Sequence, residues 1–437
     1  LVINYGGSST NQDVRIIVGT NAGALHMFED NGDTVDENWV IMPNEFFRKY
    51  KSLRDNFTSS GKVYGIDSPA EPYLVDVNGD GSINASDGDK AWIFFGLRRG
   101  GNAYYGLDVT NPNSPTLLWR IDGSTAGFGE LGQTWSQPKV GYSALNISGG
   151  IPKPVIFFGG GYDISKDNSG PGTDDTVGRA IYMVDAQSGT LLWSMSPAAG
   201  SAINTQVTTL TDGIAASIGL LDSDADGLHD RLYAGDTGGN VWRVDMPGSS
   251  PSSGSSPWTA HKLASLGGTT DADDRRFFSE PSIVRTYISD TIETTTTDSE
   301  GNSSTVVTRQ ERPYDAILIG SGDRSTPTDS DTDDKFFMIR DENIRTTSFV
   351  LSPSGEQLAI PTPITISDLY DYTNNPFGDF TYPYTAEEKA ALQELEIAVS
   401  LKSGWFVDFT ANGEKSLAEA LAINNVAFFT SFTPADN

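Results

Sequence analysis

An acidic loop near the middle of the chain has the residue types and spacing of a calcium site. Its candidate ligands are the side chains of Asp222, Asp224, Asp226 and Asp230 and the backbone carbonyl of Leu228. Gly227 permits the tight turn that folds alternate carboxylates inward, where Ca²⁺ takes about six to eight oxygen ligands. Four carboxylates this close repel one another unless they share a cation or splay into solvent. The pattern therefore predicts a Ca²⁺ site, with an acidic surface turn as the alternative.

One residue of this loop is expected to have no part in the site. His229 stands between two presumed ligands, but imidazole is a poor ligand for calcium. We therefore expect its side chain to point outward.

A second acidic loop matches the EF-hand pattern over a longer stretch. The first, third, fifth, seventh, ninth and twelfth places are held by Asp76, Asn78, Asp80, Ser82, Asn84 and Asp87. Gly81 and Ile83 fill the usual glycine and apolar places between them. Asp87 replaces the usual bidentate Glu, as in the loops of dockerin modules, and the flanks are typical of strands rather than helices. The pattern predicts a second Ca²⁺ site, with an acidic turn between strands as the alternative.

A repeated sequence motif of strand, polar turn and strand supplies the framework for these loops. Apolar strands end at Asp108, Asp185 and Asp245, and a weaker copy ends at Glu29. Such copies predict stacked β-modules, and their spacing exceeds the roughly 40–50 residues of compact propeller repeats, so the modules must carry insertions. The 46 Gly and 22 Pro fit many turns between short strands. We expect an all-β fold, a single irregular β-propeller of about seven blades over residues 1–437, with inserted loops and hairpins.

Two helices are expected among the strands, and only they should exceed two turns. Phe46, Phe47 and Tyr50 recur at helical spacing within Asn44–Phe57. A capping box of Thr385 and Glu388 predicts a helix over Ala386–Ser400.

The remaining insertions are loops and one hairpin. Pro247–Pro257 has almost nothing to bury and is expected to be a flexible loop, and Asp323–Asp334 a solvated one. Thr291–Arg312 alternates β-branched and polar residues on either side of a turn, which predicts a projecting hairpin. A strand within Val426–Phe432 is expected to pair with the first strand, because closure removes exposed edges.

The composition excludes several classes of function. The net charge of -29, from 29 basic and 58 acidic residues, repels nucleic acids and anionic lipids. The absence of cysteine excludes disulfides, thiolate metal sites and cysteine nucleophiles. No apolar run approaches the roughly 20 residues that a membrane helix needs, so direct membrane insertion is not expected. The sequence opens without a leader peptide, which is consistent with a processed or excised fragment.

Six segments carry a resemblance to a known family, and in chain order they read VGTNAGALHMFED, RRGGNAYYGLDVTNP, LGQTWSQPKVG, VIFFGGGYD, LYAGDTGGNVWRVD and AFFTSFTP. They resemble the C-terminal β-propeller of the PilY/PilC family of type IV pilus tip proteins. That family carries an Asp-x-Asp-x-Asp/Asn-x-x-x-Asp calcium loop before its YAGD segment, and the loop at Asp222 matches it.

The resemblance implies a calcium-responsive module that controls pilus extension and retraction, twitching motility and surface adhesion. It implies minor pilins or the pilus tip, the family's own N-terminal region, and host or abiotic surfaces as partners. It also implies a location at the pilus tip on the cell surface, or in the outer membrane or periplasm of a Gram-negative bacterium. No Arg-Gly-Asp tripeptide occurs, so integrin binding through one is not supported.

Catalysis is not expected. Pyrroloquinoline-quinone propeller dehydrogenases repeat a phrase like VDAQSGTLLW in every blade, but here it occurs cleanly once, and the usual paired cysteines are absent. A non-catalytic outer-membrane assembly scaffold with the same repeat is a further alternative, although it would not need two acidic loops. His26, His229 and His261 lie far apart, and nucleophile-elbow and phosphate-loop motifs are lacking. A quinone titration would test the dehydrogenase alternative.

Overall fold

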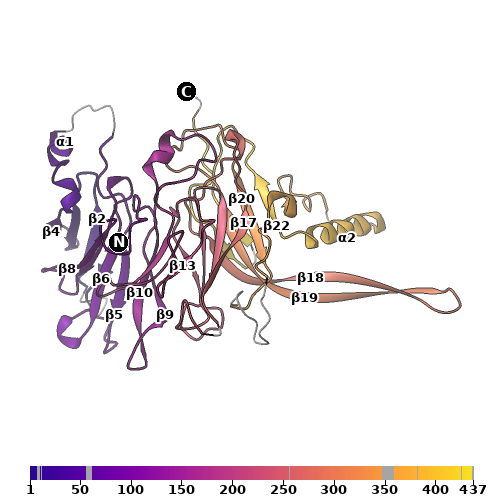
Figure 1. Cartoon of the computed structure of the whole chain (residues 1–437), viewed down its shortest axis with the longest axis horizontal. Coiled ribbons are helices and arrows are strands. Elements are labelled where there is room, and N and C mark those ends of the chain that lie inside the picture. Colours follow the sequence, from indigo (N-terminus) through magenta and orange to yellow (C-terminus); the bar gives the residue numbers. More distant parts are fainter. Residues whose placement is uncertain are drawn as a thin grey trace.

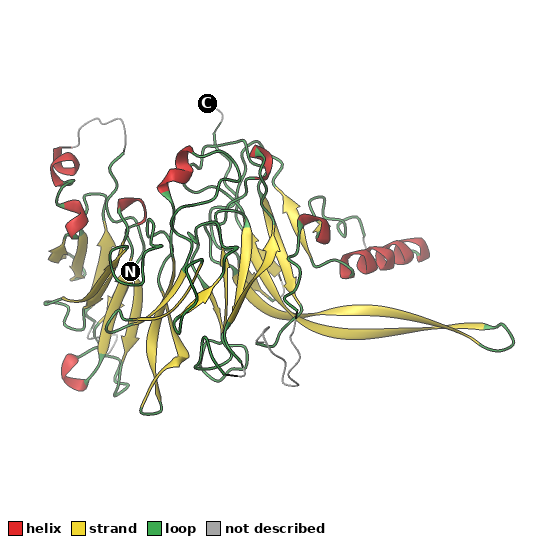
Figure 2. Ribbon diagram, viewed as in Figure 1, coloured by secondary structure: helices red, strands yellow, loops and turns green. Residues whose placement is uncertain are grey.

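The computed structural model describes residues 1–6, 10, 12–55, 62–254, 256–346, 359–380, 382–424 and 426–435. Their strands form five sheets of four or five strands and a sixth sheet of two strands. The sheets follow one another in chain order, like the blades of a propeller (Figures 1 and 2). The predicted all-β propeller class is confirmed.

Blade 1 contains β1 (Val2–Asn4), β2 (Val14–Gly19), β3 (Leu25–Asp30) and β4 (Val35–Ile41). Blade 2 contains β5 (Glu71–Val75), β6 (Lys90–Phe95), β7 (Ala103–Asp108) and β8 (Thr116–Asp122). Blade 3 contains β9 (Lys139–Ser148), β10 (Ile151–Gly159), β11 (Ile181–Asp185), β12 (Leu191–Ser196) and β13 (Asn204–Gln206). Blade 4 contains β14 (Gly219–Leu221), β15 (Arg231–Gly235), β16 (Asn240–Asp245) and β17 (Thr259–Ser265).

Blade 5 contains β18 (Ser282–Thr297), β19 (Ser303–Gly320), β20 (Lys335–Asp341), β21 (Tyr370–Asp371) and β22 (Gly404–Asp408), and the sixth sheet contains β23 (Leu421–Ile423) and β24 (Val426–Phe428). The helices are η1 (Asn44–Phe46), α1 (Tyr50–Asp55), η2 (Ala85–Asp87), η3 (Arg98–Gly100), η4 (Ile164–Asn168), η5 (Asp271–Asp273), η6 (Ile366–Asp368) and α2 (Ala386–Ser400), where η marks a 3₁₀ turn. No described helix is long and apolar enough to cross a membrane.

Hydrophobic cores lie between successive blades. Alternate side chains of a strand point to opposite faces of its sheet, and both faces of an inner strand are covered here. In β10, Ile156 and Phe158 pack toward blade 2, whereas Val155 and Phe157 pack toward blade 4. The continuous apolar runs in the sequence follow from this burial on both faces. Each blade therefore depends on its neighbours for a core.

The ends of the array differ from the prediction. The last strand, β24, pairs with β23, and β1 pairs with β2, so the predicted pairing of the last strand with the first is wrong. The described residues form six sheets where about seven blades were expected. Strand β23 ends at Ile423 and β24 begins at Val426, and Asn424 between them has a φ of 50°. Pairing across so short a turn costs much less chain entropy than closure onto the first strand.

The two predicted helices had different outcomes. The helix predicted over Asn44–Phe57 is instead η1 followed by α1, which is shorter than two turns, and Phe57 lies outside the described residues. Phe46 is fully buried while Phe47 is 61% exposed, so the aromatic residues do not share one buried face. The helix predicted over Ala386–Ser400 is confirmed as α2.

The start of α2 provides a test of local stability. The Glu388 N–H donates to the Thr385 hydroxyl at 3.1 Å, and the Thr385 N–H donates to the Glu388 carboxylate at 2.7 Å. We expect Thr385→Ala to lower the free energy of unfolding of α2 by about 1 kcal/mol, because the Glu388 N–H loses the hydroxyl that accepts from it. Hydrogen exchange at α2 would measure this effect. Equal exchange in Thr385→Ala and the parent protein would contradict it, and Thr385→Ser is the conservative control.

Because the first three strands of a blade pair in antiparallel fashion, the connections between them alternate between the two ends of the blade. The connections between first and second strands lie at one end of the blades, and those between second and third strands lie at the other. The first kind includes both acidic loops, between β5 and β6 and between β14 and β15, and the turn between β18 and β19. Both predicted metal loops thus occupy equivalent places in blades 2 and 4.

A long two-stranded ribbon projects from blade 5 (Figures 1 and 2). Strands β18 and β19 pair from Ser282–Leu318 to Thr297–Ser303, whereas β20 joins only the stretch from Asp315 to Gly320. The hairpin predicted over Thr291–Arg312 is therefore confirmed. The described residues of Pro247–Pro257 form neither helix nor strand.

Candidate calcium site

The β14–β15 loop gathers three carboxylates. Oxygen atoms of Asp222, Asp224 and Asp226 lie within 4.8 Å of one another. The Gly227 N–H donates to Asp222 Oδ2 at 2.8 Å, and the Leu228 N–H donates to Asp226 Oδ1 at 2.8 Å. The turn uses positive φ angles of 63° at Ala225 and 89° at Gly227. Backbone donors thus hold the carboxylates in a curled loop whose donor set fits a hard cation such as Ca²⁺.

The fourth predicted carboxylate has a different partner. Asp230 accepts hydrogen bonds from the Ser223 N–H at 3.0 Å and from the Ser223 hydroxyl at 2.5 Å. It therefore closes the loop at its base instead of joining the three-carboxylate cluster. Leu228, whose carbonyl is the fifth predicted ligand, is half-buried between the cluster and this base.

The prediction that His229 points outward is wrong. Its side chain is half-buried, and its backbone N–H donates to the Tyr142 carbonyl at 2.8 Å. The Tyr142 N–H in turn lies 3.2 Å from His229 Nδ1, to which it donates. His229 thus satisfies both backbone groups of a residue on β9, the edge strand of blade 3. The order of residues along the chain carries no signal for this contact.

The β5–β6 loop repeats the hydrogen-bonding pattern of the first loop. The Gly81 N–H donates to Asp76 Oδ2 at 2.7 Å, and the Ser82 N–H donates to Asp80 Oδ1 at 2.8 Å. These bonds join the same loop places as the bonds from Gly227 and Leu228. The two loops therefore share one conformation over their first seven places.

The later places of the β5–β6 loop are built differently. The amide of Asn78 reaches both Asp80 at 3.1 Å and Asp87 at 3.4 Å, and Asn84 caps η2 by accepting from the Ser86 N–H. The amide nitrogen of Asn78 thus faces the two carboxylates, whereas its Oδ1, the atom that would bind Ca²⁺, accepts from the Asp80 N–H at 3.0 Å. The predicted set Asp76, Asn78, Asp80, Ser82, Asn84 and Asp87 occupies one continuous loop and turn.

The sequence reasoning missed one residue that shapes this loop. Asp89, which is only 4% exposed, accepts from the Val77 N–H at 2.8 Å and from the Asn84 N–H at 2.9 Å. It closes the base of its loop as Asp230 closes the other. The only sequence signal is an Asp just beyond the EF-hand pattern, at the start of the apolar strand β6.

The β14–β15 loop is tied to the projecting ribbon. The Ser223 carbonyl accepts from Arg285 Nη1 at 2.9 Å, and Arg285 is on β18. Arg285 Nε also donates at 2.9 Å to Asp315 of β19, which accepts at 2.7 Å from the fully buried Arg231 next to Asp230. The hydrogen bond with Asp315 raises the pKa of Arg285, so this guanidinium stays charged. The loop and the ribbon therefore belong to one hydrogen-bond network.

Residues 3–333 match the family model of the PilY1 β-propeller domain. The chain belongs to this family. The type IV pilus biogenesis factor PilY1 of Pseudomonas aeruginosa strain PAO1 is 24% identical over 455 residues, which cover 97% of this chain and 33% of the relative. The PilY1 homologue of Xylella fastidiosa strain Temecula1 is 22% identical over 434 residues, which cover 96% of this chain and 24% of the relative.

The crystal structure of the Pseudomonas aeruginosa PilY1 C-terminal domain shares the fold. Its TM-score is 0.59 at 18% identity, and the match covers 97% of this chain and 76% of that domain. The chain spans at most 33% of the length of the curated relatives described above. Those relatives are named as biogenesis factors, which favours the PilY1 family over the quinoprotein dehydrogenase and the assembly scaffold.

Proposed function

We propose that this PilY1-family propeller is a calcium-binding, non-enzymatic part of a type IV pilus biogenesis factor at the bacterial cell surface. In this proposal, occupancy of the loop at Asp222 sets the base of the β18–β19 ribbon. The observation that carries it is the contact between the Ser223 carbonyl and Arg285. Minor pilins at the pilus tip, the N-terminal region of the full-length relatives, and host or abiotic surfaces are the partners that we propose.

Asp230 provides the link between the ion and the ribbon. It is a candidate ligand at the ninth place of the loop, and it is also the partner of Ser223. Any change in its position therefore acts on the residue whose carbonyl binds Arg285. A bound Ca²⁺ would offset two of the four negative charges around it. An ion shifts such an equilibrium only if it binds one arrangement more tightly than the other.

The β5–β6 loop is proposed as a second, independent calcium site. Its support is the shared conformation with the β14–β15 loop and the donor set of carboxylate, amide and hydroxyl oxygens. No hydrogen bond from this loop to the ribbon is present within the described residues. We therefore assign it a local structural role, so that its loss costs order in blade 2 and leaves the ribbon unchanged.

The regulatory role is tested by Arg285→Gln in cells that produce the full-length protein. This change removes the charged contact with Ser223 and leaves all five candidate ligands intact. We expect normal amounts of folded protein, calcium affinity close to that of the parent, and altered surface piliation and twitching. Arg312→Gln is the matched control, because Arg312 lies on the same ribbon in a surface ion pair with Glu342.

Two outcomes would count against the proposal. In the first, cells with Arg285→Gln match the parent in piliation and twitching, both with calcium and after chelation. Calcium would then have a structural role only. Equal defects in Arg312→Gln and Arg285→Gln would assign the effect to the ribbon in general and not to its contact with the loop.

A further inference from the structure

A positively lined pocket lies at the end of the blades opposite the acidic loops. It is formed by connections between second and third strands and by connections that lead from one blade to the next. Its volume is about 310 Å³, and it is lined by Lys49, Lys62, Val63, Tyr64, Arg99, Gln133 and Ile164. None of these seven residues is acidic, although the chain has 58 acidic and only 29 basic residues. The pocket therefore has the opposite charge to the protein as a whole, which favours an anionic ligand.

Two donors at this pocket have no acceptor. Gln133 is only 7% exposed, and its side-chain oxygen accepts from Trp135 Nε1 at 3.1 Å, but its amide nitrogen donates to nothing in the described structure. The ammonium of Lys62 lies 4.8 Å from the centre of the Tyr64 ring and forms no ion pair with a described residue. A ligand carboxylate would give both of these donors an acceptor.

Arg99 shows that a carboxylate fits beside this pocket. Both terminal nitrogens of its guanidinium bind Asp167, and the second of these contacts is 2.9 Å long. The guanidinium is fixed between the rings of Trp135 and Tyr162, each 5.4 Å away. The preceding Arg98 adds a second guanidinium, whose Nε has no hydrogen-bond partner among the described residues. Burial and Arg324 lower the pKa of Arg98 to about 10.

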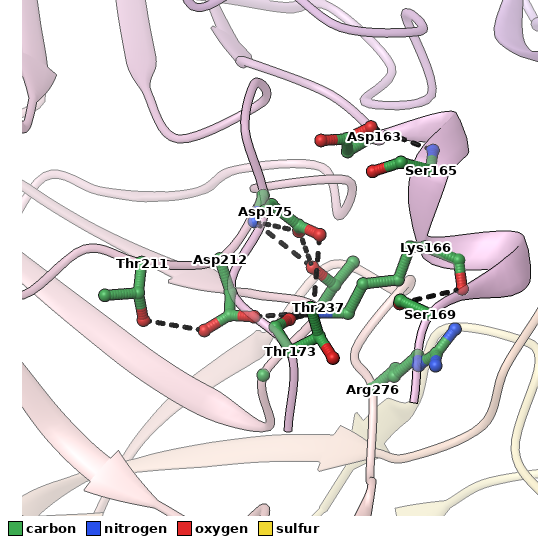
Figure 3. Close-up of polar contacts among 12 residues, drawn as sticks. Asp163, Ser165, Lys166, Ser169, Thr173, Asp175, Thr211, Asp212, Thr237 and Arg276 are labelled. Carbon is green, nitrogen blue, oxygen red and sulfur yellow. Dashed lines mark hydrogen bonds and ion pairs between the residues drawn. The ribbon is translucent and has the colours of Figure 1, made fainter. Parts of the chain in front are cut away.

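The 3₁₀ turn η4, which contributes Ile164 to the pocket, is held in place by buried ion pairs of Lys166 (Figure 3). Lys166, in the middle of η4, is 2% exposed and lies 2.6 Å from Asp212 and 3.4 Å from Asp175. The same 3₁₀ turn presents Ile164 to the pocket and Asp167 to Arg99. The pocket is therefore preorganised, which lowers the cost of binding.

We propose that this pocket binds a carboxylate carried on an apolar group, as at the C-terminus of a polypeptide. Lys62 and the Gln133 amide supply the donors, and Val63, Tyr64 and Ile164 contact the apolar part. Arg99 stays paired with Asp167 and stiffens the wall of the pocket. The size and apolar walls favour such a group over a bare inorganic anion. The net charge of -29 repels long polyanions such as nucleic acids. The pocket is independent of the calcium loops.

Calorimetry with three probes tests the proposal. The probes are an N-acetylated tripeptide that ends in leucine with a free carboxylate, the same peptide with a C-terminal amide, and acetate. We expect binding of the peptide acid at millimolar concentration and no binding of the amide. Gln133→Glu should weaken binding of the peptide acid by about tenfold or more, because it replaces the free donor by an anion. It still offers Trp135 an acceptor, so the local structure is retained.

A second variant and a control keep the test decisive. Lys62→Glu, at an exposed position, should also weaken binding by about tenfold. Lys153→Glu, an exposed change on β10, should bind as the parent does. Equal binding of the acid and the amide, no binding of the acid, or equal weakening in all three variants would overturn the proposal. Acetate binding as tight as that of the peptide acid would overturn the assignment to a peptide terminus.

Discussion

The free energy of unfolding is expected to fall by about 3–5 kcal/mol when Asp315 is replaced by Asn, because a buried arginine then loses its charged partner. Asp315 and Arg231 are both fully buried, and their side chains lie 2.7 Å apart. Asp315 also accepts from Arg285 at 2.9 Å. Asn has almost the same shape, but its amide supplies no negative charge for either guanidinium. The remaining acidic group near Arg231, Asp245, lies at 3.6 Å and is already bound to Arg243.

Chemical denaturation followed by tryptophan fluorescence would measure this loss. The matched control is Asp33→Asn in an exposed turn of blade 1, which should change the free energy of unfolding by less than about 0.5 kcal/mol. A loss of less than about 1 kcal/mol in Asp315→Asn would show that Arg231 is effectively solvated. The same variant should also loosen Arg285 from the calcium loop, so faster proteolysis of the ribbon is expected before global unfolding.

Features set by neighbouring residues could be predicted from the sequence. The strand ends at Asp108, Asp185 and Asp245 are the ends of β7, β11 and β16. The capping box of α2 and the projecting hairpin depend on side-chain chemistry and alternation within a short stretch. The curled conformation of both acidic loops follows from carboxylates, amides and glycines placed a few residues apart.

Features that join distant segments could not be predicted. Arg285 and Ser223 are 62 positions apart, and Arg99 and the Ser325 carbonyl are 226 positions apart. His229 was misjudged because the strand edge that it satisfies belongs to another blade. The closure of the ring was misjudged for a related reason, since local pairing of β23 with β24 competes with pairing to β1. Periodicity and spacing carry no information about such competition.

The largest expected effect on ligand binding concerns Asp224. Asp222 and Asp226 each accept a 2.8 Å bond from the loop backbone, so their replacement would disturb the loop itself. The nearest backbone donor to Asp224 is the Asp226 N–H, at 3.3 Å. Asp224→Ala therefore separates ion binding from loop folding. Calcium affinity at this loop should fall by about tenfold or more, because the number of ligand charges sets the affinity of such sites.

Calorimetry on chelated protein would measure this change together with the stoichiometry. The parent should bind two calcium ions, and Asp224→Ala and Asp87→Ala should each retain one tight site, in opposite loops. At a free calcium concentration 100-fold above the dissociation constant, an occupied site stabilises the fold by about 2.7 kcal/mol, so chelation should lower the Tm of the parent and affect each variant less. Magnesium should compete poorly, because it needs a tighter octahedron and retains its waters. Unchanged affinity and stoichiometry in Asp224→Ala would remove Asp224 from the ligand set, whereas loss of both sites in one variant would contradict their independence.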